Sequence, residues 1–148
     1  MGEGSEALRR EVYEANMKLA ASGLVLDTFG NVSGLDPEAG VFYIKPSGVP
    51  YEALTPEGMV PVSVESGKVM GGDLRPSSDT PTHLELYRAF GCRGIAHTHS
   101  EFATVLAQAR RPLRCMGTTH ASHLPPPPAL VEKHFLRKHG PDAYYGQK

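Results

Sequence analysis

The chain has 148 residues and a formal net charge of -1 at pH 7, which excludes the strongly basic surface of proteins that bind nucleic acids or anionic membranes. Hydrophobic residues make up 40% and charged residues 21% of the sequence, and this balance excludes a fibrous or disordered chain and favours one globular domain with a single core. No apolar run reaches the roughly 20 residues of a membrane helix, and the first residues lack the features of a signal peptide. A cytoplasmic location is therefore expected.

The first third of the chain predicts one helix followed by two strands. The helix is indicated by apolar residues at helical spacing after Ser5, with Gly23 as its end; these residues are Leu8, Val12, Ala15 and Leu19. The apolar run at 24–29 predicts a strand, and the glycines at 30 and 34 predict a tight turn in which Asn31 either supports its own backbone or contacts a ligand. Residues 41–45 alternate as a second strand that ends in the turn Pro46-Ser47-Gly48.

The middle of the chain predicts a hairpin and then a helix with a distinctive beginning. A one-turn helix is expected at 55–57, a strand at 60–64, a turn at Ser66-Gly67 and a short return strand at 68–70. The stretch Arg75-Pro76-Ser77-Ser78-Asp79-Thr80-Pro81-Thr82-His83 then opens a helix, with Thr80 as its N-cap and Pro81 at its first position. The predicted buried face of this helix consists of Leu84, Leu86, Tyr87 and Phe90.

The last part of the chain predicts further strands and helices, so an α/β layered domain is expected. A strand at 94–99 precedes a helix at 101–109, and another strand is predicted at 112–116. Four successive prolines at 125–128 favour polyproline II, which predicts a joint between residues 1–124 and a C-terminal helix and tail at 129–148 of the same domain.

Two histidines on the strand at 94–99 form the first candidate site. His97 and His99 are two residues apart, so on a strand they point to the same face about 6.6 Å apart, where both imidazoles can reach one zinc ion. Asp79 is the nearest carboxylate that can fold back onto that face. The alternatives are a pair of hydrogen-bonded histidines lining a sheet and an aspartate that only caps its helix.

Three predicted turns form a candidate phosphate site, because turn N-H groups, hydroxyls and a nearby cation are the groups that bind phosphate. Ser77 and Ser78 precede a helix, and Lys45 and Asn31 lie near other turns. The side chains of Ser77 and Lys45 are predicted to lie in turns and outside the core, so the loss of either is expected to weaken phosphate binding and leave the fold intact.

Several of these stretches together resemble the class II aldolase and adducin family, and within it the L-ribulose-5-phosphate 4-epimerases. They are Gly30-Asn31-Val32-Ser33, Ile44-Lys45-Pro46-Ser47-Gly48-Val49, residues 75–83, His97-Thr98-His99-Ser100, Gly117-Thr118-Thr119-His120-Ala121, Leu136-Arg137-Lys138-His139-Gly140 and Ala143-Tyr144-Tyr145-Gly146-Gln147. The resemblance implies a three-layer α/β/α fold with a mixed, mainly antiparallel sheet. It also implies a homotetramer with active sites between subunits and a zinc, manganese or other divalent ion.

The resemblance further implies interconversion of L-ribulose 5-phosphate and D-xylulose 5-phosphate by retro-aldol cleavage and re-addition. Asp79, His97 and His99 match metal-binding positions, and Tyr145 matches a tyrosine that acts as an acid or base from a neighbouring subunit. The positions that match the substrate and phosphate loops are Gly30, Asn31, Lys45, Ser47, Gly48, Ser77 and Ser78.

The chain also departs from the family. The polyproline joint replaces a long segment that carries a third metal-binding histidine, and Ser122 stands where the family has a catalytic aspartate. Residues 1–124 therefore resemble an incomplete family domain, and weak metal binding, poor solubility and low activity are expected. His120 and His123 are the remaining candidates for a further metal ligand. Two other interpretations stay open: a related sugar-phosphate aldolase, and an inactive interaction module.

Overall fold

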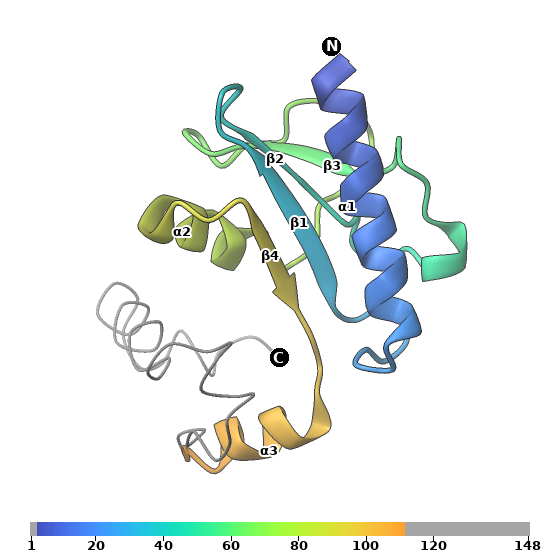
Figure 1. Cartoon of the computed structure of the whole chain (residues 1–148), viewed down its shortest axis with the longest axis vertical. Coiled ribbons are helices and arrows are strands. Elements are labelled where there is room, and N and C mark those ends of the chain that lie inside the picture. The colour runs from blue at the N-terminus through green and yellow to red at the C-terminus, as the bar shows by residue number, and fades with distance from the viewer. Residues whose placement is uncertain (1–2, 112–148) are drawn as a thin grey trace, which may run out of the picture. The chain divides into compact units, whose positions relative to one another are not determined.

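The computed structural model describes residues 3–111 (Figure 1). The elements are α1 (Glu3–Ala21), β1 (Asn31–Asp36), β2 (Val41–Ile44), the 3-10 helix η1 (Tyr51–Ala53), β3 (Val60–Ser63), α2 (Thr80–Phe90), β4 (Gly94–His97) and α3 (Glu101–Gln108). Residues up to Ser100 form one compact unit, and α3 belongs to a second unit. The predicted strand at 112–116, the polyproline joint and the C-terminal helix lie outside the described residues, as does the predicted domain division.

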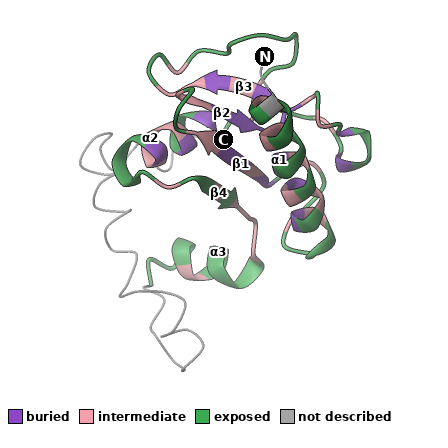
Figure 2. Cartoon of the chain, turned by 45° about the horizontal axis from the view of Figure 1, so that its top comes forward, coloured by how far each residue is buried: buried purple, intermediate pink, exposed green. Residues whose placement is uncertain are grey.

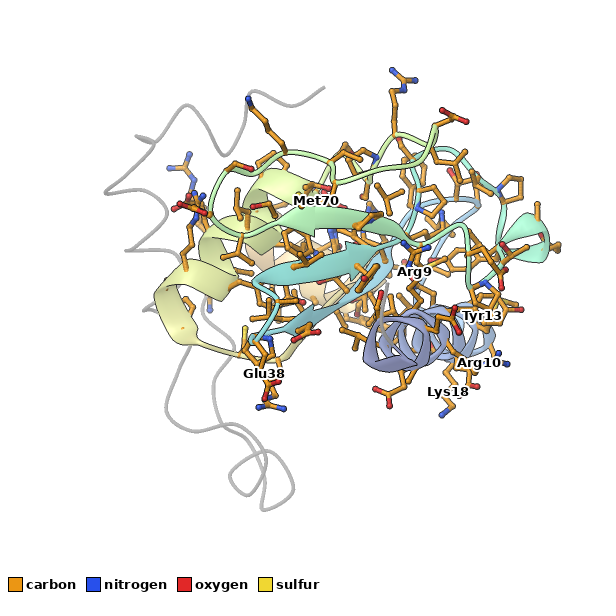
Figure 3. All side chains as sticks on the ribbon, turned by 90° about the horizontal axis from the view of Figure 1, so that it is seen from above. Arg9, Arg10, Tyr13, Lys18, Glu38 and Met70 are labelled. Carbon is orange, nitrogen blue, oxygen red and sulfur yellow. The ribbon has the colours of Figure 1, made fainter. Side chains whose placement is uncertain are left out.

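The first unit is built on a four-stranded sheet in the order β3-β2-β1-β4. Every pairing among these strands is antiparallel, and Asn31 at the start of β1 pairs with His97 at the end of β4. The helices α1 and α2 lie on opposite sides of the strands, as the view from above shows (Figure 3). The predicted α/β class is confirmed, while the parallel component of the predicted mixed sheet has no counterpart within residues 3–111.

The helix α1 is held against one face of the sheet by packing and by one buried amide. The Asn16 side chain is fully buried; its Nδ2 donates to the carbonyl oxygen of Val32 at 2.9 Å, and its Oδ1 accepts the Val32 N-H at 2.8 Å. A Cβ at Gly34 would lie 2.7 Å from a Val12 methyl carbon, so only glycine lets the helix approach β1 this closely. The core on this face consists of Val12, Tyr43, Tyr51, Leu54 and Met59.

The opposite face carries a second core that α2 covers. Its buried members are Phe42, Ile44, Val60, Val62 and Tyr87, and Figure 2 shows buried residues along β1, β2 and β3, whereas β4 is largely exposed. Successive residues of a strand point to opposite faces, which is why Phe42 and Ile44 belong to this core and Tyr43 to the other. Among the described residues, no helix is long and apolar enough to cross a membrane.

Several predicted elements are wrong in the first half of the chain. Residues 24–29 form turns and not a strand, with Leu24, Leu26 and Phe29 exposed, and β1 occupies the predicted turn instead. The reason is tertiary: the polar side chains of Asn31 and Ser33 are buried with partners far along the chain, which local turn propensity cannot indicate.

Other differences concern the hairpin and the predicted helices. The predicted return strand at 68–70 is reduced to a single bridge between Val62 and Val69, and the short helix lies at η1, before the predicted 55–57. The helix α2 begins at Thr80, one residue before the predicted start, because Asp79 and not Thr80 is its N-cap. Phe90 is 49% exposed, and the buried face includes His83 instead.

Candidate functional site

The centre of the candidate site is the Asp79 carboxylate, directly before α2. Asp79 occupies the N-cap position, yet its side chain makes no cap hydrogen bond. Its Oδ2 instead accepts a 2.6 Å hydrogen bond from Asn31 Nδ2 and lies 2.8 Å from His97 Nδ1. The structure thus brings together residues that are 48 and 18 positions apart in sequence, and the capping alternative for this side chain is not what the structure shows.

Asn31 links this carboxylate to the serine loop before α2. Its Nδ2 also lies 3.1 Å from Ser77 Oγ, and Ser77 Oγ accepts the Asp79 N-H at 3.2 Å. The Asp79 carboxylate fixes the orientation of the amide, because a flip would turn Asn31 Oδ1 toward another oxygen acceptor. Asn31 Oδ1 is buried and has no hydrogen-bond partner within residues 3–111. Since a buried acceptor without a partner is costly, this atom is a candidate to receive a hydrogen bond from a ligand.

The two imidazoles lie side by side, although β4 ends at His97 and not at the predicted residue 99. Their ring centroids are 5.0 Å apart, with only 9° between the ring planes. Two contacts hold His99 in place. Its backbone N-H donates to the Leu24 carbonyl oxygen at 2.9 Å, and the Phe29 ring stacks on the imidazole with 5.2 Å between the ring centroids. The exposed turn at 24–29 therefore has a function in the site, because it supports the second histidine.

The contact between Asp79 and His97 shifts both groups toward their charged forms. The hydrogen bond with His97 is the main cause that lowers the pKa of Asp79 below its usual value, and burial opposes it. The same hydrogen bond raises the pKa of His97, again against the effect of burial. A carboxylate on Nδ1 also leaves Nε2 as the ring nitrogen of His97 that can bind a metal.

Two of the three predicted phosphate turns, those at Ser47-Gly48 and Ser77-Ser78, lie next to each other. The Ser47 N-H donates to the Arg75 carbonyl oxygen at 2.9 Å, the Ser77 N-H donates to the Lys45 carbonyl oxygen at 3.0 Å, and Pro46 forms a bridge with Pro76. Ser47, Gly48 and Ser78 are exposed, so their hydroxyls and turn backbone are open to a ligand. The N-H groups of Ser47 and Ser77 already have carbonyl partners, which limits a phosphate to the other donors of these loops.

Lys45 was predicted to lie in an exposed turn, and this prediction is wrong. The residue is 2% exposed and directly follows β2. Its ammonium donates to the carbonyl oxygens of Val49 at 2.8 Å and Thr28 at 3.1 Å, and it lies 4.8 Å from the centre of the Tyr51 ring. Burial lowers the pKa of Lys45. This side chain joins the loop before β1 to the loop after β2, a role that the sequence did not indicate.

Gly30 directly precedes β1 in a left-handed conformation, with φ of 80°. A Cβ there would collide with the Val25 side chain and lie 3.2 Å from the His97 carbonyl oxygen. Its own carbonyl oxygen accepts a 2.9 Å hydrogen bond from the Tyr51 hydroxyl. Tyr51 thus supports the backbone beside Asn31, another contribution that sequence reasoning missed.

The described part of the site supplies two imidazoles and one carboxylate, which are suitable ligands for zinc. Within residues 3–111, however, no three His, Cys, Asp or Glu side chains are placed together so as to hold an ion. The donor chemistry fits a divalent ion at His97 and His99, with Asp79 orienting His97. Tyr145, His120, His123 and Ser122 lie outside the described residues, so their predicted contributions are not placed by the structure.

Comparison with known proteins shows which family the chain resembles, without use of the site geometry. Residues 10–140 match the model of the class II aldolase and adducin N-terminal domain. An L-fuculose 1-phosphate aldolase is 32% identical with a TM-score of 0.69, covering 74% of this chain and 51% of its own. The L-fuculose-1-phosphate aldolase of Thermus thermophilus is 31% identical with a TM-score of 0.65, covering 79% and 57%.

YgbL from Escherichia coli is 29% identical with a TM-score of 0.63, covering 71% of this chain and 50% of its own. The chain therefore spans about half the length of these structures. The match to the family model nevertheless includes Asp79, His97 and His99, since it spans residues 10–140. On this evidence the chain is a member of the class II aldolase and adducin family.

Proposed function

We propose that this chain is a metal-dependent enzyme that acts on a sugar phosphate by retro-aldol chemistry, specifically as an L-ribulose-5-phosphate 4-epimerase. The observation that carries the proposal is the group formed by Asp79 Oδ2, 2.8 Å from His97 Nδ1, and the His99 ring parallel to that of His97. When bound, zinc, manganese or another divalent ion would supply positive charge that stabilises the negative charge formed as a carbon-carbon bond breaks.

The residues of this chain would have distinct tasks. His97 and His99 would hold the ion, and the Asp79 carboxylate would accept a hydrogen bond from the Nδ1–H of His97 and so direct Nε2 toward the ion. The loops around Ser47-Gly48 and Ser77-Ser78 would bind the phosphate, and the Asn31 Oδ1 atom would accept a hydrogen bond from a substrate hydroxyl. Tyr145 would act as an acid or base from a neighbouring subunit of a homotetramer, and His120 or His123 would supply a further metal ligand.

A related aldolase is the second candidate, because two of the similar structures are named as L-fuculose-1-phosphate aldolases. The epimerase is preferred because Asp79 stands where those aldolases are expected to carry Glu, and because the Tyr144-Tyr145-Gly146-Gln147 ending resembles the epimerases. The full chain would be incubated with zinc and either L-ribulose 5-phosphate or L-fuculose 1-phosphate. Formation of D-xylulose 5-phosphate supports the epimerase, whereas release of dihydroxyacetone phosphate only from the second substrate supports the aldolase.

Absence of both activities, together with absence of metal binding, would favour the third interpretation, an inactive interaction module. Because the chain lacks the long segment of the family, its activity is expected to be lower than that of a full-length epimerase. Metal content per subunit and the oligomeric state, both measured by native mass spectrometry, would separate a weak enzyme from an assembly module.

Asp79→Asn is expected to lower zinc affinity about 10- to 100-fold, the usual effect of removing a carboxylate that orients a metal-binding histidine. Isothermal titration calorimetry measures this effect, with circular dichroism to confirm that the variant folds. Asp73→Asn is the matched control, because Asp73 is exposed in a loop. Equal zinc affinity in the Asp79 variant and the wild type would show that the carboxylate does not orient His97 for a metal.

A further inference from the structure

We propose that Ser33 is a positioning residue, which sets the place of Asp79 by joining β1 to α2 through His83 and Tyr87. The proposal rests on the proposed function only where it treats Asp79 as part of a metal site. None of these three residues belongs to the candidate ligands described above. They form a buried polar group in a core that otherwise consists of Phe42, Ile44, Val60 and Val62.

The Ser33 hydroxyl lies at the centre of this group. Its Oγ is 2.7 Å from His83 Nδ1 and 2.6 Å from the Tyr87 hydroxyl. All three residues are buried, with at most 3% of any of them exposed. A serine hydroxyl has one donor and two acceptor sites, so it can bond both partners at once. Because His83 and Tyr87 are four residues apart on α2, they present their polar atoms to β1 from consecutive turns of one helix face.

The spacing of this contact matches that of the Asn31–Asp79 contact. Asn31 and Ser33 are two residues apart on the same face of β1, about 6.6 Å along the strand. Asp79 and His83 are four residues apart along α2, a rise of about 6 Å, and the His83 N-H donates to the Asp79 carbonyl oxygen at 3.0 Å. The strand and the helix are thus connected at two matching levels, Asn31 with Asp79 and Ser33 with His83.

These hydrogen bonds restrict the sliding of α2 along β1 more strictly than apolar packing alone would. Hydrogen bonds weaken steeply when their angle or length changes, whereas apolar contacts tolerate sliding. A shift of α2 along β1 would break the contacts of Ser33 before it exposed the core, and it would move Asp79 relative to Asn31 and His97. The buried polar group therefore fixes the position of the carboxylate, at the expense of a more stable apolar core.

The test compares Ser33→Ala with a matched control on the other face of the sheet. Ser5 Oγ bonds the Tyr43 hydroxyl at 2.5 Å and joins α1 to β2, so Ser5→Ala also removes a serine–tyrosine contact between a helix and the sheet. Three properties are measured on the full chain: thermal stability, the NMR signal of the Asn31 side-chain amide without metal, and zinc affinity by calorimetry. Tyr87→Phe and Tyr43→Phe form a second matched pair, which decides the question by the same criteria if Ser33→Ala does not fold.

Ser33→Ala is expected to shift the Asn31 amide signal and to lower zinc affinity about 10- to 100-fold, while Ser5→Ala changes neither. A loss of thermal stability in Ser33→Ala with an unchanged Asn31 signal and unchanged zinc affinity would overturn the proposal and leave Ser33 an ordinary core contact. If the wild-type chain binds no zinc, the proposed function fails, and the Asn31 signal alone decides whether Ser33 positions Asp79.

Discussion

Replacing Lys45 with alanine is expected to lower the free energy of unfolding by about 2 to 4 kcal/mol, because partly buried carbonyl groups lose their donor and the packing of the lysine stem is lost. Lys45 is 2% exposed as a residue, and its ammonium donates to the carbonyl oxygens of Val49 and Thr28 at 2.8 and 3.1 Å. It also lies 4.8 Å from the centre of the Tyr51 ring, a contact that adds a cation–π contribution. Burial of an ammonium is itself unfavourable and lowers the pKa of Lys45. The hydrogen bonds to these carbonyl groups offset that cost of burial.

Urea denaturation measures this effect, with two further variants that separate its causes. Lys45→Met keeps most of the hydrocarbon chain and loses the donor, so it is expected to recover only the packing part of the loss. Lys68→Ala is the control for removal of a lysine at an exposed position, and it is expected to change stability by about 0.5 kcal/mol or less. A Lys45→Met protein as stable as the wild type would contradict the role given to the ammonium.

The same substitution bears on the site, because Lys45 joins the loop that leads to Asn31 with the loop that carries Ser47 and Gly48. Loss of phosphate binding in Lys45→Ala would therefore not by itself identify the ammonium as a phosphate ligand. A ligand role requires that Lys45→Ala lose affinity for a phosphorylated pentulose while the Asn31 and Ser47 backbone signals stay unchanged.

The sequence predicted the parts of the fold that depend on local patterns. The helix α2 was found, with its start one residue from the predicted position, because Pro81 lies in its first turn and an apolar face continues it. The strand β2 was found because its alternating residues face two different cores. The proximity of Asp79, His97 and His99 was expected from their types and spacing, although their roles as ligands stay predictions.

The parts that could not be predicted depend on buried polar residues. Asn16, Lys45 and His83 interrupt the apolar pattern and are at most 2% exposed, because backbone or side-chain partners distant in sequence satisfy them. The strand β1 was mistaken for a turn for the same reason, since Gly30, Asn31, Ser33 and Gly34 favour turns until α1 and α2 pack on both sides. Hydrophobic periodicity contains no information about such partners.

Lowering the pH from about 6.5 to about 4 is expected to decrease the free energy of unfolding by roughly 3 kcal/mol through His83 alone. Burial lowers the pKa of His83 from 6.5 to about 4, so in this window the unfolded chain binds a proton that the folded chain does not. Stability therefore falls as the pH falls. His97 does not cancel the effect, because its pKa is raised and it is protonated in both states below about pH 6.5. The pKa of Asp79 is lowered, so its contribution is lost only below about pH 4.

Urea unfolding across this pH window, with His83→Asn as the variant, provides the test. An asparagine amide can accept the Ser33 hydrogen bond near the position of Nδ1 but has no group that titrates in the window. The wild type is therefore expected to lose stability on acidification, and the variant is expected to lose roughly 3 kcal/mol less over the same range. NMR titration of the His83 ring in the wild type gives a direct second measurement, because the ring is expected to stay neutral until the pH approaches about 4. Parallel stability curves for the two proteins, or a ring that titrates near 6.5, would mean that His83 is open to water and that the contact between β1 and α2 is looser than the structure shows.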